Sequence, residues 1–150
     1  MANLSLRREV RYVPNIPGNR ELPEAEQISF SITAGLTTVE MAAFNRDALA
    51  AAHLPLADGA TPEQAAEHIA RQNAALAAVV GAFVRVNPSN TTLEGVNIAT
   101  VLDYFNALDQ RPGGWLLTGE LVSEVRRVNS LEGERALFSV RSSGGTTSTR

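Results

Sequence analysis

Apolar residues follow one spacing at the start of the chain and another in the rest. In residues 6–13, Leu6, Val10 and Tyr12 fall on one side of an alternating pattern, and apolar and hydroxyl side chains alternate over residues 28–33. This period-two spacing is typical of β-strands. Within residues 14–19, Pro is followed by Gly, the order that a type II turn requires. We therefore predict a β-hairpin with a long connection.

Helices are predicted after this hairpin. Thr37 and Glu40 have the spacing of a capping box and precede apolar residues at three- and four-residue steps, which predicts a helix over about 38–52. Residues 61–64, Thr-Pro-Glu-Gln, give a stronger start signal because Pro suits the first helical position. Ala occupies 16 of the 41 positions from 42 to 82, which favours helix and close packing.

The second predicted helix carries a stripe of larger apolar residues. Ile69, Leu76 and Phe83 recur every seven residues, with Val79 and Val80 beside them. This spacing predicts about five helical turns that pack on the side of the stripe.

The last third of the chain predicts shorter helices. The segment 87–90, Asn-Pro-Ser-Asn, is typical of a loop, and residues 98–108 have the apolar spacing of a third helix. Thr118 is expected to cap a fourth helix. Ser130 is expected to cap a short fifth helix that contains residues 137–138.

These elements predict an α+β fold that is mostly α: an N-terminal β-hairpin arm followed by a compact bundle of about four to five short helices. We expect a single domain over residues 1–141, with the arm over about 1–34 and the helical body over about 36–141. Residues 142–150 contain no apolar side chain and are expected to form a flexible tail.

Composition narrows the classes of function. The chain has no Cys, which excludes disulfide frameworks, zinc ribbons and thiol nucleophiles. No apolar run reaches the roughly 20 residues that cross a bilayer, and residues 1–8 lack a signal-peptide core. The formal net charge of −3 argues against a nucleic-acid partner, since only Arg7, Arg8 and Arg11 form a basic cluster. We expect a cytosolic protein with neither a membrane nor a nucleic acid as partner.

Residues suited to catalysis are few and scattered. His53 and His68 are the only histidines. Their nearest acidic residues in sequence are Asp58, Glu63 and Glu67. Glu67 and His68 are adjacent, so their side chains would point about 100° apart on a helix. Asp103, Asp109 and Glu94 offer paired carboxylates, a pattern that solvated helix faces also produce. We therefore expect no catalytic residue, no metal and no cofactor.

Trp115, the only Trp, admits two interpretations. It would anchor an interface with another chain, or it would cover the seam between the third and fourth predicted helices. The hairpin arm likewise must pack on the helical body or on another chain. The apolar residues that the helix stripes explain least well are the candidate interface: Tyr12, Val13, Ile16, Trp115, Leu116 and Leu117.

Two patches carry a resemblance to a known class of proteins. The segments 115–125 and 129–135 resemble small tailed-bacteriophage proteins of head and tail assembly, and tail-assembly chaperones above all. Residues 11–14 and 18–21 are similar to the start of some of these proteins. The resemblance implies a non-enzymatic assembly or virion protein that contacts other phage structural proteins or itself. It would act in the host cytoplasm during assembly, or remain in the virion.

The resemblance leaves several functions open. A tail-assembly chaperone would bind apolar segments of a tape-measure or tail-tube protein and then leave the particle, whereas a virion component would stay. The sequence also allows an unrelated bacterial protein-interaction module or a small enzyme, since fold class does not separate these functions.

Overall fold

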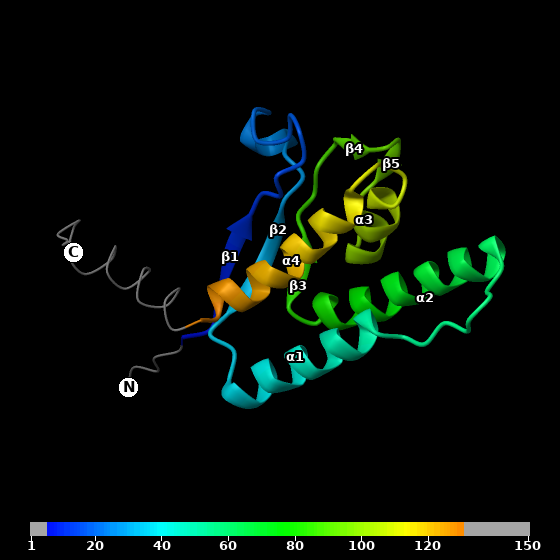
Figure 1. Cartoon of the computed structure of the whole chain (residues 1–150). Helices are drawn as coiled ribbons and strands as arrows, with labels where there is room; N and C mark the ends of the chain where they lie inside the picture. Colours follow the sequence, from blue (N-terminus) through cyan, green and yellow to red (C-terminus); the bar gives the residue numbers. More distant parts are fainter. Residues whose placement is uncertain (1–5, 131–150) are drawn as a thin grey trace, which may run out of the picture.

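The computed structural model describes residues 6–130 (Figure 1). In chain order the elements are β1 (Arg8–Tyr12), the short 3-10 helix η1 (Glu24–Glu26), β2 (Phe30–Ala34), α1 (Thr38–Ala52), α2 (Pro62–Gly81), β3 (Val84–Val86), β4 (Thr92–Leu93), β5 (Val96–Asn97), α3 (Val101–Leu108) and α4 (Gly114–Val128). The predicted α+β class with mostly α content is confirmed. The expected fifth helix and the tail lie outside the described residues.

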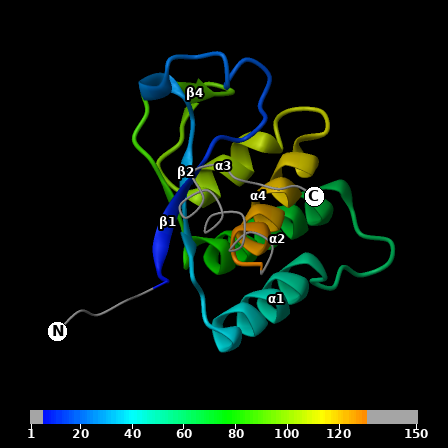
Figure 2. The same cartoon turned by 90° about the vertical axis from the view of Figure 1, so that its left-hand side faces the viewer.

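The N-terminal hairpin and β3, the strand that follows α2, form a three-stranded antiparallel sheet with the order β1-β2-β3. The predicted hairpin is present, with Val10 opposite Ile32. Phe30, Ile32 and Ala34 of the central strand β2 are completely buried. Helices α3 and α4 lie on one face of the sheet (Figures 1 and 2). The sequence left two packing partners open for the arm, the helical body and another chain. The structure shows the arm packed on the helical body.

The third strand was missed by the sequence analysis. Phe83 fits the seven-residue stripe of the preceding helix, but α2 ends at Gly81 and the chain turns directly into β3. Three residues are too few to produce a recognisable period-two pattern. Val84 of this strand is buried in the core.

The long connection between β1 and β2 is held by internal hydrogen bonds. The predicted turn is confirmed: Asn19 N–H donates to Ile16 O at 2.9 Å, and Gly18 has a φ of 85°. The buried Asn19 side chain donates from Nδ2 to Ile28 O and accepts at Oδ1 from Ile28 N–H. A side-chain amide that hydrogen-bonds to both the N–H and the C=O of one residue satisfies the two backbone groups that a neighbouring strand would otherwise pair. The patch 18–21 therefore has a structural role.

Both predicted capping boxes are present, at Thr37 with Glu40 and at Thr61 with Gln64. The predicted packing side of α2 is confirmed for Val80, which is completely buried, and for Leu76, Val79 and Phe83, which pack against the core; only Ile69, 47% exposed, departs from it. The buried residues of α2 are His68, Asn73, Ala77 and Val80. Small and polar residues face α1 and α3 because α2 packs closely between them.

The fourth helix begins earlier than predicted. Helix α4 starts at Gly114, so Thr118 lies inside it and is not its cap. Gly113, with a φ of 72°, is the residue that precedes the helix. Gly114 packs directly on the backbone of Leu108 at the end of α3. Two glycines thus form the tight junction between α3 and α4.

Helix α3 is capped by Thr100, whose hydroxyl accepts from Asp103 N–H. The β4–β5 hairpin was not predicted; its turn places Glu94 and Gly95 at positive φ. Over residues 6–130, no helix combines the length and the hydropathy that crossing a membrane requires.

Candidate protein-interaction site

A groove of about 500 Å³ lies between the end of α1, the middle of α2 and the α3–α4 junction. Its lining includes Ala51, Ala52, Ile69, Gln72, Asn73, Leu76, Leu108, Gly114, Trp115 and Thr118. We call it the Trp115 groove. The indole of Trp115 and the side chain of Ile69 contribute apolar surface that remains accessible, at 71% and 47% exposure.

The exposure of Trp115 follows from the start of α4. Gly114 is the first buried residue of this helix, and the following residue is rotated by about 100° around the axis. Trp115 therefore points away from the core, and Leu116 is 60% exposed beside it. The seam between α3 and α4 is closed by Gly114, so the interpretation in which Trp115 covers this seam was wrong.

Beyond the groove, one further contact joins α4 to α1. Helical spacing places Gly119, Val122 and Arg126 on the side of α4 that Trp115 occupies. At the far end, Arg126 Nε donates to Asn45 Oδ1 at 2.9 Å and joins the two helices. On α1, Leu49 follows Asn45 by one turn and is exposed.

The polar groups of the groove already have partners within the chain. Asn73 Nδ2 donates to Asp109 and to Asn106. Gln72 Nε2 donates to Ala52 O at 3.1 Å. Asp109 and Arg111 also line the groove, and Arg111 lies 3.8 Å from the Glu94 carboxylate. Because these polar groups have partners within the chain, the groove offers a ligand mainly apolar surface and the edge of an indole.

The structure separates the six candidate interface residues into two groups. Ile16 is only 6% exposed and belongs to the core, and Tyr12 and Val13 are half-buried. These three residues lie in β1 and the loop that follows it. Trp115 and Leu116 are exposed and Leu117 is half-buried. The structure therefore does not form one surface from all six residues, and it gives Ile16 a packing role.

Tyr12 links β1 to α4. Its hydroxyl donates to the Glu120 carboxylate, which also accepts from Asn15 N–H at 3.1 Å. Burial, followed by this hydrogen bond, raises the pKa of Tyr12 well above its ordinary value. The neutral phenol is therefore the form that the folded protein favours. Sequence reasoning missed this contact because the two residues are 108 positions apart.

This contact predicts a loss of stability at alkaline pH. An unfolded Tyr ionises near pH 10, so the stabilisation from the raised pKa of Tyr12 is present below about pH 10 and is lost as the pH rises above it. The free energy of unfolding, measured in urea between pH 8 and 11, is expected to fall more steeply for the wild type than for Tyr12→Phe. Burial also raises the pKa of Tyr104, but this group is common to both proteins. Equal slopes would contradict the role of Tyr12.

Most of the residues considered for catalysis make contacts that belong to the fold. The backbone carbonyl of Leu49 lies 2.9 Å from His53 Nδ1, and His68 is buried in α2. Asp103 completes the cap of α3, and Glu94 lies 3.8 Å from Arg111. In the part of the chain from 6 to 130, no three His, Asp or Glu side chains gather to form a metal site.

The basic cluster is likewise engaged within the protein. Arg7 pairs with Glu40 at 3.0 Å, and this contact together with the cap of α1 lowers the pKa of Glu40. Arg11 donates to Glu24 O and to Gln27 Oε1.

Comparison with known proteins identifies no relative of this chain. No family model matches the sequence, and neither a curated protein nor a solved structure matches it. The candidate site therefore rests on its own geometry. The sequence pointed to the site through Trp115, whereas Ala51, Ile69 and Gln72 belong to it only because α1 and α2 pack next to the start of α4.

Proposed function

We propose that this chain is a non-enzymatic protein-interaction subunit of tailed-bacteriophage assembly or of the virion, and that it binds its partner through the Trp115 groove. The observation that carries the proposal is the exposed Trp115, which lines a mostly apolar groove and is followed in the chain by the exposed Leu116. Trp is enriched among the residues that contribute most to binding, because it buries a large area at small entropic cost.

The form of the groove supports a protein segment as its ligand. Its floor is made of small side chains such as Ala51 and Ala52, so an apolar side chain from a partner has room to enter. Ile69 adds exposed apolar surface on the side of α2. An apolar centre with satisfied polar groups around it is the anatomy of protein interfaces.

The bacteriophage setting rests on the resemblance of residues 115–125, 129–135, 11–14 and 18–21 to phage assembly proteins. Segment 115–125 forms most of α4 and includes the exposed Trp115. In this setting the partner is another structural protein of the particle, or a second copy of the chain. A tail-assembly chaperone and a virion component would use the same surface and differ in how long they stay bound.

Trp115→Ala is expected to weaken binding at least about 30-fold, equivalent to about 2 kcal/mol, because truncating a central aromatic anchor has effects of this size. The midpoint of thermal unfolding should change little, since the side chain is mostly exposed. The measurement is co-purification and titration with the structural proteins encoded in the same gene cluster, together with the oligomeric state in solution.

Val39→Ala is the matched control, because Val39 is 78% exposed on α1 and lies outside the Trp115 groove. It should leave binding unchanged. Trp115→Phe should retain part of the affinity. Equal binding by Trp115→Ala and Val39→Ala, to every partner and to itself, would contradict the proposed function.

A further inference from the structure

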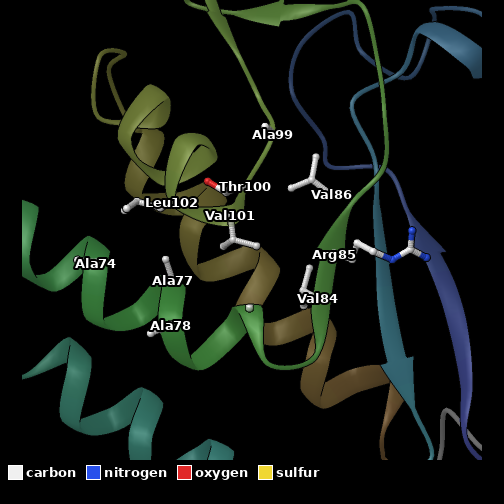
Figure 3. Close-up of a pocket in the computed structure, with 11 residues that line it drawn as sticks. Ala74, Ala77, Ala78, Val84, Arg85, Val86, Ala99, Thr100, Val101 and Leu102 are labelled. Carbon is white, nitrogen blue, oxygen red and sulfur yellow. The ribbon is translucent and has the colours of Figure 1, made fainter.

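Chemistry that the proposed function does not use lies in a turn rather than in a cavity. A hollow of about 660 Å³ between α2, β3 and α3 is lined mostly by alanine and valine (Figure 3). Its charged residue, Arg85, pairs with Glu9 at 2.6 Å, and its Thr100 hydroxyl caps α3. The connection between α1 and α2, in contrast, presents two neighbouring residues that react with each other.

Asp58 and Gly59 form a turn in this connection, which Figure 1 shows at the edge of the molecule. Both residues are exposed, and Gly59 has a φ of 74°. Nothing lies within 4 Å of the position that a Cβ of Gly59 would take. Exposed turns with small and polar residues are among the most mobile parts of a folded chain. The backbone here therefore has room to change conformation.

An Asp-Gly pair carries its own reaction. The backbone nitrogen of Gly attacks the side-chain carboxyl carbon of Asp, a C–N bond forms as a C–O bond breaks, and water leaves. The product is a cyclic imide. Glycine favours this step because it has no Cβ to hinder the approach of its nitrogen. Asp58-Gly59 is the only Asp-Gly pair in the chain, and no Asn is followed by Gly.

The two reacting groups of this turn have no partner among residues 6–130. The Asp58 carboxylate makes no hydrogen bond or ion pair with these residues, and the Gly59 N–H has no acceptor among them. A hydrogen bond from this N–H would oppose the loss of its proton, and a partner for the carboxylate would hold it away from the amide. Neither restraint acts at this turn in the described part of the chain.

The other aspartates of the chain are restrained by helices. Asp47 lies inside α1, where the next N–H belongs to the helix. The residue after Asp103 donates its N–H to Thr100 O at 3.2 Å. The residue after Asp109 donates its N–H to Ala107 O at 3.1 Å. Within residues 6–130, only the turn between α1 and α2 leaves the amide after an aspartate free.

We propose that Asp58 isomerises spontaneously to isoaspartate in the folded protein. Water opens the imide at either of its two carbonyls. Attack at the Cγ carbonyl restores Asp58, whereas attack at the α-carbonyl leaves Gly59 joined through Cβ and Cγ and frees the α-carboxylate. The water lost in the first step is regained in the second, so the mass of the chain does not change. This modification does not depend on the proposed function.

Isoaspartate lengthens the backbone of the connection by one methylene group. The change falls outside both helices, because α1 ends at Ala52 and α2 starts at Pro62. The hydrogen bond from Gln72 Nε2 to Ala52 O and the cap of α2 at Thr61 also lie outside the turn. The modified chain therefore keeps its fold, and its new carboxylate is accessible to an enzyme that methylates isoaspartate with S-adenosylmethionine.

The test follows the full chain during incubation at neutral pH, with circular dichroism to show that it stays folded. Trypsin then releases residues 47–71 as one peptide, because Arg46 and Arg71 are consecutive cleavage sites. The isoaspartyl form has the same mass but a different retention time, and electron-transfer fragmentation locates it. Transfer of labelled methyl groups by a recombinant isoaspartate methyltransferase measures its amount.

Isoaspartate is expected at residue 58 at a rate close to that of a synthetic peptide of residues 54–62, and not at Asp47 in the same tryptic peptide. Asp58→Glu keeps the charge but needs a larger ring, so methyl incorporation should fall several-fold. The proposal is overturned if residue 58 stays aspartate while the synthetic peptide isomerises, or if Asp47 converts as fast as Asp58. It is equally overturned if Asp58→Glu accepts as many methyl groups as the wild type.

Discussion

Phe30→Ala is expected to lower the free energy of unfolding by about 3–5 kcal/mol, because it removes a large, completely buried side chain. Phe30 lies at the centre of the sheet, and its ring contacts that of Tyr104 edge-on at a centroid distance of 4.8 Å. The loss is a large part of the 5–15 kcal/mol by which domains are usually stable.

The same variant tests whether the sheet and the helices form one cooperative unit. Because Phe30 connects β2 to α3, the loss of helical signal and the loss of tertiary signal should move together to lower urea concentration. Phe30→Leu keeps much of the volume and should have a smaller effect. If Phe30→Ala left the helical transition unchanged, the hairpin would be an independent arm and the described core would be incorrect.

Gly114→Ala is expected to destabilise the protein by about 3 kcal/mol, the upper part of the range for overpacking. A Cβ at this position would lie 1.9 Å from the carbonyl oxygen of Leu108. The clash is with backbone, so α3 and α4 must separate to relieve it. Urea unfolding of the purified variant gives the measurement.

Gly119→Ala in the same helix is the matched control. Nothing lies within 4 Å of the Cβ that this substitution adds. Alanine is the better helix former, so this variant should be more stable than the wild type by about 0.5–1 kcal/mol. Equal effects of the two substitutions would show that the α3–α4 junction is not packed as described.

Local signals in the sequence predicted the starts of α1 and α2 and the first turn well. Thr37 with Glu40 and Thr61 with Gln64 form the predicted capping boxes, because a cap depends only on residues three positions apart. The turn that contains Gly18 was predictable for the same reason. Features that depend on residues only a few positions apart could therefore be predicted from the sequence alone.

Features that depend on tertiary packing were not predictable. Phe83 has the spacing of a helical stripe, yet it leads into β3, which is stable only because β2 pairs with it. Thr118 has the chemistry of a cap, but the contact between Gly114 and Leu108 sets an earlier start for α4. Ile69 was expected to be packed with the rest of its stripe, but it is 47% exposed, whereas the polar residues His68 and Asn73 are buried.

The candidate site was predicted in part. Trp115 and Leu116 were selected because no helix stripe explained them, and both are exposed. Tyr12 and Ile16 were selected for the same reason but pack within the domain, because the loop after β1 folds back on α4. The sequence could not separate the two cases, since the contacts that bury the loop join residues more than 100 positions apart.

The fluorescence of Trp115 reports on whether this side chain anchors the interface, because it is the only Trp in the chain. We expect the free protein to emit like a solvated indole and to be quenched efficiently by acrylamide. On addition of the partner that co-purifies with the wild type, the emission should shift to shorter wavelength and quenching should fall several-fold. An emission that is already blue-shifted and shielded in the free protein, or that does not change when the partner binds, would contradict the assignment of Trp115 as the anchor of the interface.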